Sequence, residues 1–246
     1  MFRRPFQSQL GLNLTTGLGL LAVFSVLRMA IVLQANATQS YAWVSAFFVV
    51  MILTPFALLN RLGLKRIGWR WPRGPVVSLL AIGLGIGCCA AMIYSADAFF
   101  GAGDDNAFVY IAKAYPSLPS PMDDRTRLIV FAVFASIGMT LSPVGEEVFY
   151  RGMIHEALVG TQGEHRASVV DAMAFALVHL SHFGLIWSAT GWLFLPGPAL
   201  WWVTGLFLTG LAFAWARRFT HSIAGAILAH AGFNLAMTAW IFFRVL

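Results

Sequence analysis

Two adjacent carboxylates stand in a chain that is otherwise strongly apolar. Glu146 and Glu147 lie in the run from Ser142 to Arg151, while 59% of the 246 residues are hydrophobic and only 11% are charged. A carboxylate near a hydrocarbon layer is costly unless it is paired or hydrated, so by default it marks a functional site. This run is therefore the first candidate for chemistry.

Helical geometry gives the two glutamates different neighbours. Glu147 and Arg151 lie four residues apart on nearly one face, so we expect an ion pair between them. Glu146 is turned about 100° away and is left free to face a cavity. The alternative is that Glu146 only caps a helix after Pro143 and Gly145, since acidic residues favour helix N-termini.

Further polar residues occur in apolar stretches of the same half of the chain. His179 follows Phe175 by four residues, and Asn234 follows His230 by four. Each spacing places both side chains on one helical face. A single histidine in a span often only bonds to a neighbouring helix, but two histidines and an asparagine accompanying Glu146 indicate a shared polar site.

These side chains can form one site only if they lie at a similar depth in the membrane. With a rise of about 1.5 Å per residue, His179 and His230 are expected roughly 12–17 Å from the cytoplasmic ends of their spans. Glu146 falls close to the end of its own span. We therefore expect Pro143 and Gly145 to end that span early, so that the glutamate helix turns back into the bundle.

The composition indicates a polytopic membrane protein. Mean hydropathy is +0.76, and a charged fraction of 11% compares with about 25% in soluble domains. The apolar runs are long enough to cross a core of about 30 Å as helices and lack the alternation of barrel strands. We expect an all-α transmembrane bundle of about seven to eight helices in one membrane domain, residues 1–246. The expected spans are 13–34, 41–59, 76–95, 127–145, 168–187, 199–216 and 222–243.

Basic residues predict the orientation, because short cytoplasmic connections retain lysine and arginine. If every span crosses once, the basic groups of three segments fall on one side, and the N-terminus is cytoplasmic. The loop 96–126 carries five aspartates and falls on the other side, with a short interfacial helix expected at 107–115. The net charge of +6 is explained by these loops, so no nucleic-acid partner is expected. The basic groups are Arg3, Arg4, Arg61, Lys65, Arg66, Arg70, Arg73, Arg217 and Arg218.

Three motifs in this order resemble those of a known family. They are Glu146-Glu147-x-x-x-Arg151, Phe175-x-x-x-His179 and His230-x-x-x-Asn234. The chain resembles the CAAX protease and bacteriocin-processing (Abi) family of intramembrane glutamic endopeptidases, which includes Rce1. The resemblance covers roughly residues 127–240, a motif-bearing core within the single membrane domain.

The resemblance implies a peptide hydrolase that needs no cofactor or metal. Glu146 would be the general base, with His179 holding the attacking water. His230 and Asn234 would form the oxyanion hole. Glu147, Arg151 and Phe175 would orient these groups.

Two other functions stay open from the residues alone. Glu146, His179 and His230 are also possible zinc ligands of a metal-dependent protease. A non-proteolytic scaffold, regulator, immunity protein or transporter of the same fold would use ionisable residues differently. For a protease, the expected partners are the lipid bilayer and a membrane-associated protein or peptide, prenylated or not, reaching the site from the cytoplasmic leaflet.

Several residues receive no role at this point. Arg28 lies within the first span and is expected to snorkel or to pair with an acidic residue elsewhere. Asp171 and His182 flank His179 on its helical face, where they line a cavity entrance or bond to a neighbouring helix. A series of small residues is expected to support close helix packing. The series is Gly83, Gly85 and Gly87.

Overall fold

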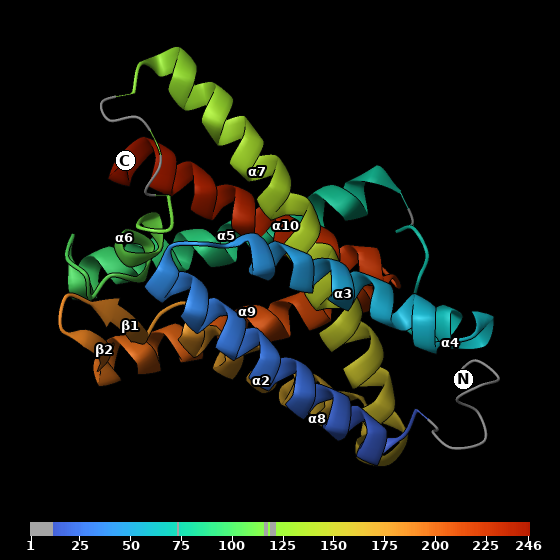
Figure 1. The fold of residues 1–246 in the computed structure, drawn as a ribbon. Helices are drawn as coiled ribbons and strands as arrows, with labels where there is room; N and C mark the ends of the chain where they lie inside the picture. The colour runs from blue at the N-terminus through green and yellow to red at the C-terminus, as the bar shows by residue number, and fades with distance from the viewer. Residues whose placement is uncertain (1–11, 73, 116–117, 119–121) are drawn as a thin grey trace.

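The computed structural model describes residues 12–72, 74–115, 118 and 122–246, and Arg3, Arg4 and Arg73 lie outside these ranges. Within them the chain is a bundle of helices with one small hairpin (Figure 1). The predicted all-α polytopic fold is confirmed. The long helices are α2 (Leu14–Thr38), α3 (Ala42–Leu58), α5 (Pro75–Phe100), α7 (Asp124–Glu147), α8 (His155–Val178), α9 (Pro196–Phe219) and α10 (Ile223–Trp240).

Short elements connect or extend these helices. A π-helical segment, η1, joins α7 to α8, so that the described chain runs helically from Asp124 to Ser181. Within α8, Gly163 has φ 76° and breaks the helix, a conformation that glycine adopts without steric cost. The short elements are α4 (Arg61–Arg66), α6 (Ala107–Ala112), η1 (Val148–Ile154), η2 (His179–Ser181), β1 (Leu185–Ser188), β2 (Gly191–Phe194) and η3 (Ile241–Val245).

The expected spans correspond to helices, with one error. Among the described residues, five helices are long and apolar enough to cross a bilayer, and α3, with 17 residues, is shorter. The span expected at 168–187 is wrong at its end, because α8 stops at Val178 and an antiparallel hairpin follows, with Leu185 opposite Phe194. Gly184 and Gly191, at φ 104° and 103°, allow the chain to turn there.

Helix α10 is central to the bundle and packs against α5, α7 and α9. Its contact with α5 depends on small residues. A Cβ at Gly85 would lie 1.7 Å from the carbonyl oxygen of Ala229, whereas a Cβ at Gly83 or Gly87 would meet nothing within 4 Å. The expected close packing therefore rests on Gly85 alone of the three.

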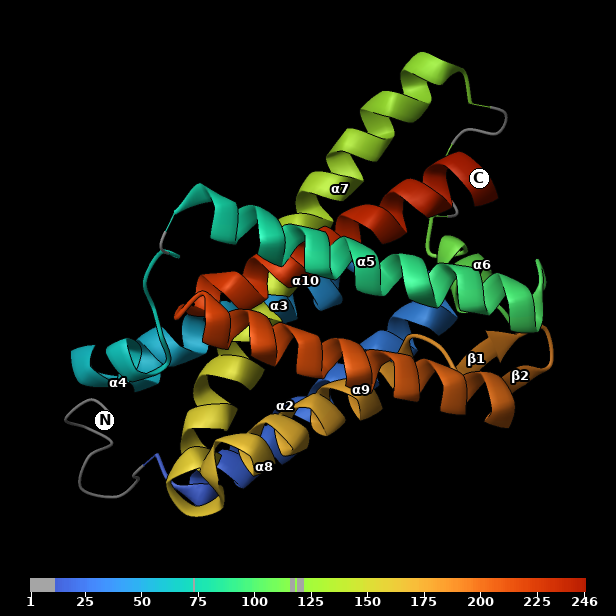
Figure 2. The ribbon, with the colours of Figure 1, turned by 180° about the vertical axis from the view of Figure 1, so that it is seen from behind.

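Of the three predicted basic segments, the two that the structure describes, α4 and the end of α9, lie at the same end of the bundle. Figure 2 shows α4 and the start of α10 at the same end, with α6 and the hairpin at the other. The Ile223 amide donates to the Gly68 carbonyl oxygen at 3.0 Å, and Arg66 pairs with Glu156 at 3.8 Å. We call this the basic end. The short helix expected at 107–115 is present as α6, at the opposite end.

Candidate active site

Glu146 lies on the last turn of α7, fully buried. The expected early end of this span is wrong: α7 continues through Pro143 and Gly145 and passes directly into η1. Gly145 permits a close approach to α3, since a Cβ there would lie 2.9 Å from the Phe48 carbonyl oxygen. Glu146 reaches the interior because α7 crosses the bundle obliquely rather than running along it (Figures 1 and 2).

One oxygen of the Glu146 carboxylate is paired and the other is not. Oε1 accepts a hydrogen bond from Nη2 of Arg28, on α2, in a buried ion pair. Oε2 has no hydrogen-bond partner. It lies 3.9 Å from Nε2 of His179 and 3.8 Å from Nε2 of His230. Polar atoms at such separations are commonly bridged by a water molecule.

The tautomers of the two histidines are inferred from their hydrogen bonds. Nδ1 of His179 lies 2.5 Å from the Phe175 carbonyl oxygen, which can only accept, so Nδ1 carries the proton. Nδ1 of His230 lies 2.8 Å from Oε1 of Glu147 and is assigned as a donor in the same way. Nε2 of each ring is then directed toward the free oxygen of Glu146.

Glu147 belongs to a separate buried cluster. The structure contains the expected ion pair, with Nη1 of Arg151 3.1 Å from Oε1 of Glu147. Nε of Arg151 also lies 3.6 Å from Oδ1 of Asp171, whose other oxygen is 2.7 Å from Nδ1 of His155. The guanidinium stands 4.3 Å from the ring centroid of Phe175. Asp171 therefore serves this cluster rather than His179.

Aromatic rings hold the two histidines in place. The Phe175 ring centroid lies 4.4 Å from that of His179 and 5.7 Å from that of His230. Phe213 stacks on His230 with the ring centroids 5.0 Å apart. Packed rings restrict rotation of the imidazoles, which keeps both Nε2 atoms directed at one point.

Asn234 shares the face of His230, as its spacing predicts, but its amide is already engaged. Nδ2 donates to the Gly138 carbonyl oxygen at 2.8 Å and lies 3.4 Å from Oγ of Ser142. Both acceptors belong to α7. Asn234 therefore ties α10 to α7 at the side of the site.

A cavity of about 240 Å³ opens in front of these groups. Arg28, His179, His230 and Asn234 all belong to its wall. The wall continues to α6 and to the α2–α3 connection, away from the basic end, so the expected access from the basic end is not supported. The residues of this outer wall are Tyr41, Ile111 and Ala114.

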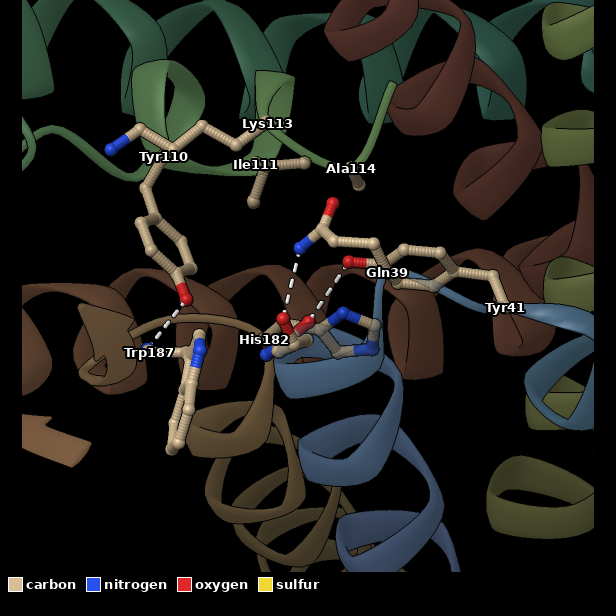
Figure 3. A pocket seen from close by; sticks show the side chains of 9 residues that line it. Gln39, Tyr41, Tyr110, Ile111, Lys113, Ala114, His182 and Trp187 are labelled. Atoms are coloured by element: carbon tan, nitrogen blue, oxygen red, sulfur yellow. Dashed lines mark hydrogen bonds between the residues drawn. The ribbon is translucent and has the colours of Figure 1, made fainter. Parts of the chain in front are cut away.

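A smaller pocket of about 60 Å³ adjoins the cavity (Figure 3). In this pocket the Trp187 amide donates to the Tyr110 hydroxyl at 2.8 Å, which joins the hairpin to α6. Polar side chains of Asn36, Gln39 and His182 line part of this pocket, so water can occupy the route between α6 and the histidines. The residues shared by the two cavities are Tyr41, Ile111, Ala114 and His182.

Comparison with known proteins now adds to this geometry. Residues 128–236 match the family described as type II CAAX prenyl endopeptidase Rce1-like. Over this segment the chain is similar to the Rce1-like family. It is therefore a CAAX-type peptide hydrolase, and its long apolar helices make it an integral membrane protein. No curated protein and no solved structure matched the chain.

The Rce1-like segment contains all seven residues of the three motifs but not Arg28. Arg28 is the main site residue without a role in the sequence analysis, although a lone charge in an apolar span was a signal. Its Nη2 lies 3.0 Å from Nε2 of His179 and 3.3 Å from Nε2 of His182. The ring centroids of His182 and His179 are 5.3 Å apart in a stacked arrangement, so His182 joins the same site.

Proposed function

We propose that this protease hydrolyses a peptide bond of a membrane-associated protein or peptide by using Glu146 as the general base. One observation carries the proposal. The free oxygen of Glu146 is buried, has no hydrogen-bond partner, and lies 3.9 and 3.8 Å from the Nε2 atoms of His179 and His230. A water molecule that donates one hydrogen to this oxygen and the other to Nε2 of one of the two histidines would be held for attack and would satisfy the buried oxygen.

The chemistry then follows in two steps. As the water oxygen bonds to the peptide carbonyl carbon, Glu146 Oε2 takes its proton and the carbonyl π electrons move onto the oxygen. On collapse of this tetrahedral intermediate the carbon–nitrogen bond breaks, and Glu146 returns the proton to the leaving amine. His179 and His230 orient the water. Glu147 keeps His230 in the required tautomer, and Arg151 forms an ion pair with Glu147.

The arrangement of charges does not favour a zinc site. Among the described residues, no group of three or more His, Cys, Asp or Glu side chains is placed to hold a metal ion. Nη2 of Arg28 contacts both Glu146 and His179, so a cation bound by these two groups would be repelled. Activity is expected to persist in strong chelator, and its loss on chelation with recovery on adding zinc would contradict this part of the proposal.

The orientation proposed from the basic residues has a consequence for substrates. With the basic end in the cytoplasm, the outer wall, which lies at the α6 end of the bundle, faces the opposite side of the membrane. We propose that the cleaved segment reaches the cavity from that side. The substrate class is then a membrane-attached protein or peptide with its cleavage site near the non-cytoplasmic surface.

The direct test compares Glu146→Gln with a matched control. The probe is an internally quenched, farnesylated peptide that ends in a CAAX sequence, added to the purified protein in detergent. We expect Glu146→Gln to lower kcat at least about 100-fold, in line with the loss of general-base catalysis. The control, Glu156→Gln, changes a glutamate on α8 whose partner is Arg66 and should retain the wild-type rate.

A well-folded Glu146→Gln protein with wild-type kcat would refute the proposal. If the wild-type protein does not cleave this peptide, mass spectrometry of membrane peptides from cells carrying wild-type or Glu146→Gln protein identifies the cleaved sequence. A complete absence of differences between the two peptide sets would also count against proteolysis by this site.

A further inference from the structure

The Arg28 side chain has hydrogen-bond donors that no acceptor among the described residues uses. Its side chain is 2% exposed, and a guanidinium carries five N–H donors and a permanent charge. Among the described residues, only Nη2 is engaged, with Glu146, His179 and His182. Nη1 and Nε are buried without a hydrogen-bond partner. Buried donors of this kind are costly unless a ligand or water satisfies them.

The position of Arg28 indicates what kind of ligand this is. Arg28 belongs to the cavity wall, beside the atoms that would hold the attacking water. Arg151 provides a comparison, because it also has unpartnered nitrogens but lies between Glu147, Asp171 and the Phe175 ring and is not part of the wall. Of these two arginines, Arg28 is the one that a substrate can reach.

The donors expected for an oxyanion hole are largely occupied. Nδ1 of His230 donates to Glu147, so Nε2 of this ring donates only when the imidazole is doubly protonated. Nδ2 of Asn234 donates to the Gly138 carbonyl oxygen at 2.8 Å. The developing negative charge on the carbonyl oxygen therefore needs a further donor. A preorganised cation in a poorly solvated cavity stabilises such a charge strongly.

We propose that Arg28 is a catalytic residue, in which one of the two free donors, Nη1 or Nε, binds the carbonyl oxygen that becomes negative during peptide hydrolysis. This inference rests on the proposed function. When water attacks, the carbonyl oxygen that receives the π electrons accepts a hydrogen bond from Arg28. This bond is released when the carbon–nitrogen bond breaks and the carbonyl group forms again. Nη2 meanwhile keeps its ion pair with Oε1 of Glu146. One side chain thus serves both the base and the oxyanion.

The alternative is that Arg28 acts only through Glu146, by neutralising the buried carboxylate. A transition-state analogue separates these roles. The probe is the farnesylated CAAX peptide with a trifluoromethyl ketone at the scissile position, because its hydrate resembles the tetrahedral intermediate. Its Kd is measured for the wild-type protein, Arg28→Lys, Glu146→Gln and the double variant. Arg127→Lys is the control, since Arg127 donates to the Phe242 carbonyl oxygen outside the cavity.

We expect Arg28→Lys to lower kcat about 100- to 1,000-fold, the range for losing an oxyanion donor. We also expect it to raise the Kd of the analogue to a similar extent in both the wild-type and the Glu146→Gln background. If the Kd does not change in the Glu146→Gln background, Arg28 acts only through Glu146 and the proposal is overturned. Full activity of Arg28→Lys would overturn it as well.

The controls separate this proposal from the proposed function. Wild-type kcat in Glu146→Gln would refute the general base, whatever Arg28 does. If Arg28→Lys is not monodisperse in detergent, Arg28→Ala with added methylguanidinium replaces it. Recovery of cleavage with saturable dependence on methylguanidinium supports the proposal, and a folded Arg28→Ala protein that shows no recovery contradicts it.

Discussion

Replacing Arg151 with methionine should destabilise this protein more than any exposed charge deletion. Arg151 is fully buried and lies 3.1 Å from Glu147 and 3.6 Å from Asp171. Removing one partner of a buried ion pair costs about 3–5 kcal/mol, because the remaining charge is left uncompensated. Loss of the guanidinium over the Phe175 ring, 4.3 Å away, costs about 0.5–2 kcal/mol. The methionine sulfur regains about 0.3–1.5 kcal/mol on the same ring.

The net expectation for Arg151→Met is therefore a loss of about 3–5 kcal/mol in the free energy of unfolding. Unfolding by sodium dodecyl sulfate in mixed micelles, followed by circular dichroism, measures this loss. The control is Arg66→Met, whose side chain is 52% exposed and pairs with Glu156 at 3.8 Å. Its expected loss is at most about 1 kcal/mol. Equal losses in the two variants would refute the reasoning from burial.

A double variant tests the cause of the loss. In Arg151→Met with Glu147→Gln, one of the two uncompensated carboxylates is absent, so part of the lost stability should return. The hydrogen bond from Nδ1 of His230 should persist in the double variant, because the glutamine amide oxygen also accepts it. A double variant less stable than Arg151→Met alone would show that charge compensation is not what Arg151 provides.

Three further predictions concern packing, access and pH. Gly85→Ala should lose about 1–3 kcal/mol in detergent unfolding through overpacking against α10, whereas Gly83→Ala, with nothing within 4 Å, should gain up to about 1 kcal/mol. In a cysteine-free background, membrane-impermeant maleimide added to cells should label Ala114→Cys but not Lys65→Cys, and the reverse pattern would contradict the proposed orientation. Backbone hydrogen bonding at the start of α7 lowers the pKa of Asp123, so its stabilising effect is present above the unfolded-state pKa and is lost as pH falls through the folded-state pKa. Asp123→Ala should lack this loss in acid unfolding curves.

Hydropathy predicted the bundle because each span in lipid must satisfy its backbone hydrogen bonds within its own helix. This constraint acts on short stretches of sequence, so it can be recognised without the tertiary structure. The errors fall where local pattern and tertiary contact disagree. The apolar run that ends α8 continues past Val178 as a hairpin, since Gly184 and Gly191 allow the turn and β1 and β2 pair with each other. Pro143 does not end α7, because a proline removes one backbone donor and the packed bundle retains the helix around it.

The motif residues were predictable because the family motifs and helical periodicity both depend on residues that are close together in the sequence. Arg28 was not assigned, because its partner Glu146 is 118 residues away and the register between two helices is not encoded in either helix alone. The helix surfaces that face lipid and those that face other helices are both apolar and similar in composition. The sequence of a span therefore does not show which helix supplies the partner of its charged residue. The unpaired arginine signalled a partner without identifying it.

Glu146 and Glu147 lie near different nitrogen atoms of the same imidazole, that of His230. Glu147 binds Nδ1 of His230 at 2.8 Å, while the free oxygen of Glu146 lies 3.8 Å from Nε2 of the same imidazole. Each carboxylate has its own arginine, Arg28 for Glu146 and Arg151 for Glu147. In the proposed reaction Glu146 takes a proton from water, and the charge of its partner Arg28 is then balanced by the oxyanion that forms on the substrate. We place the chemistry at Glu146 because its free oxygen lies near both Nε2 atoms, and its partner Arg28, unlike Arg151, belongs to the cavity wall.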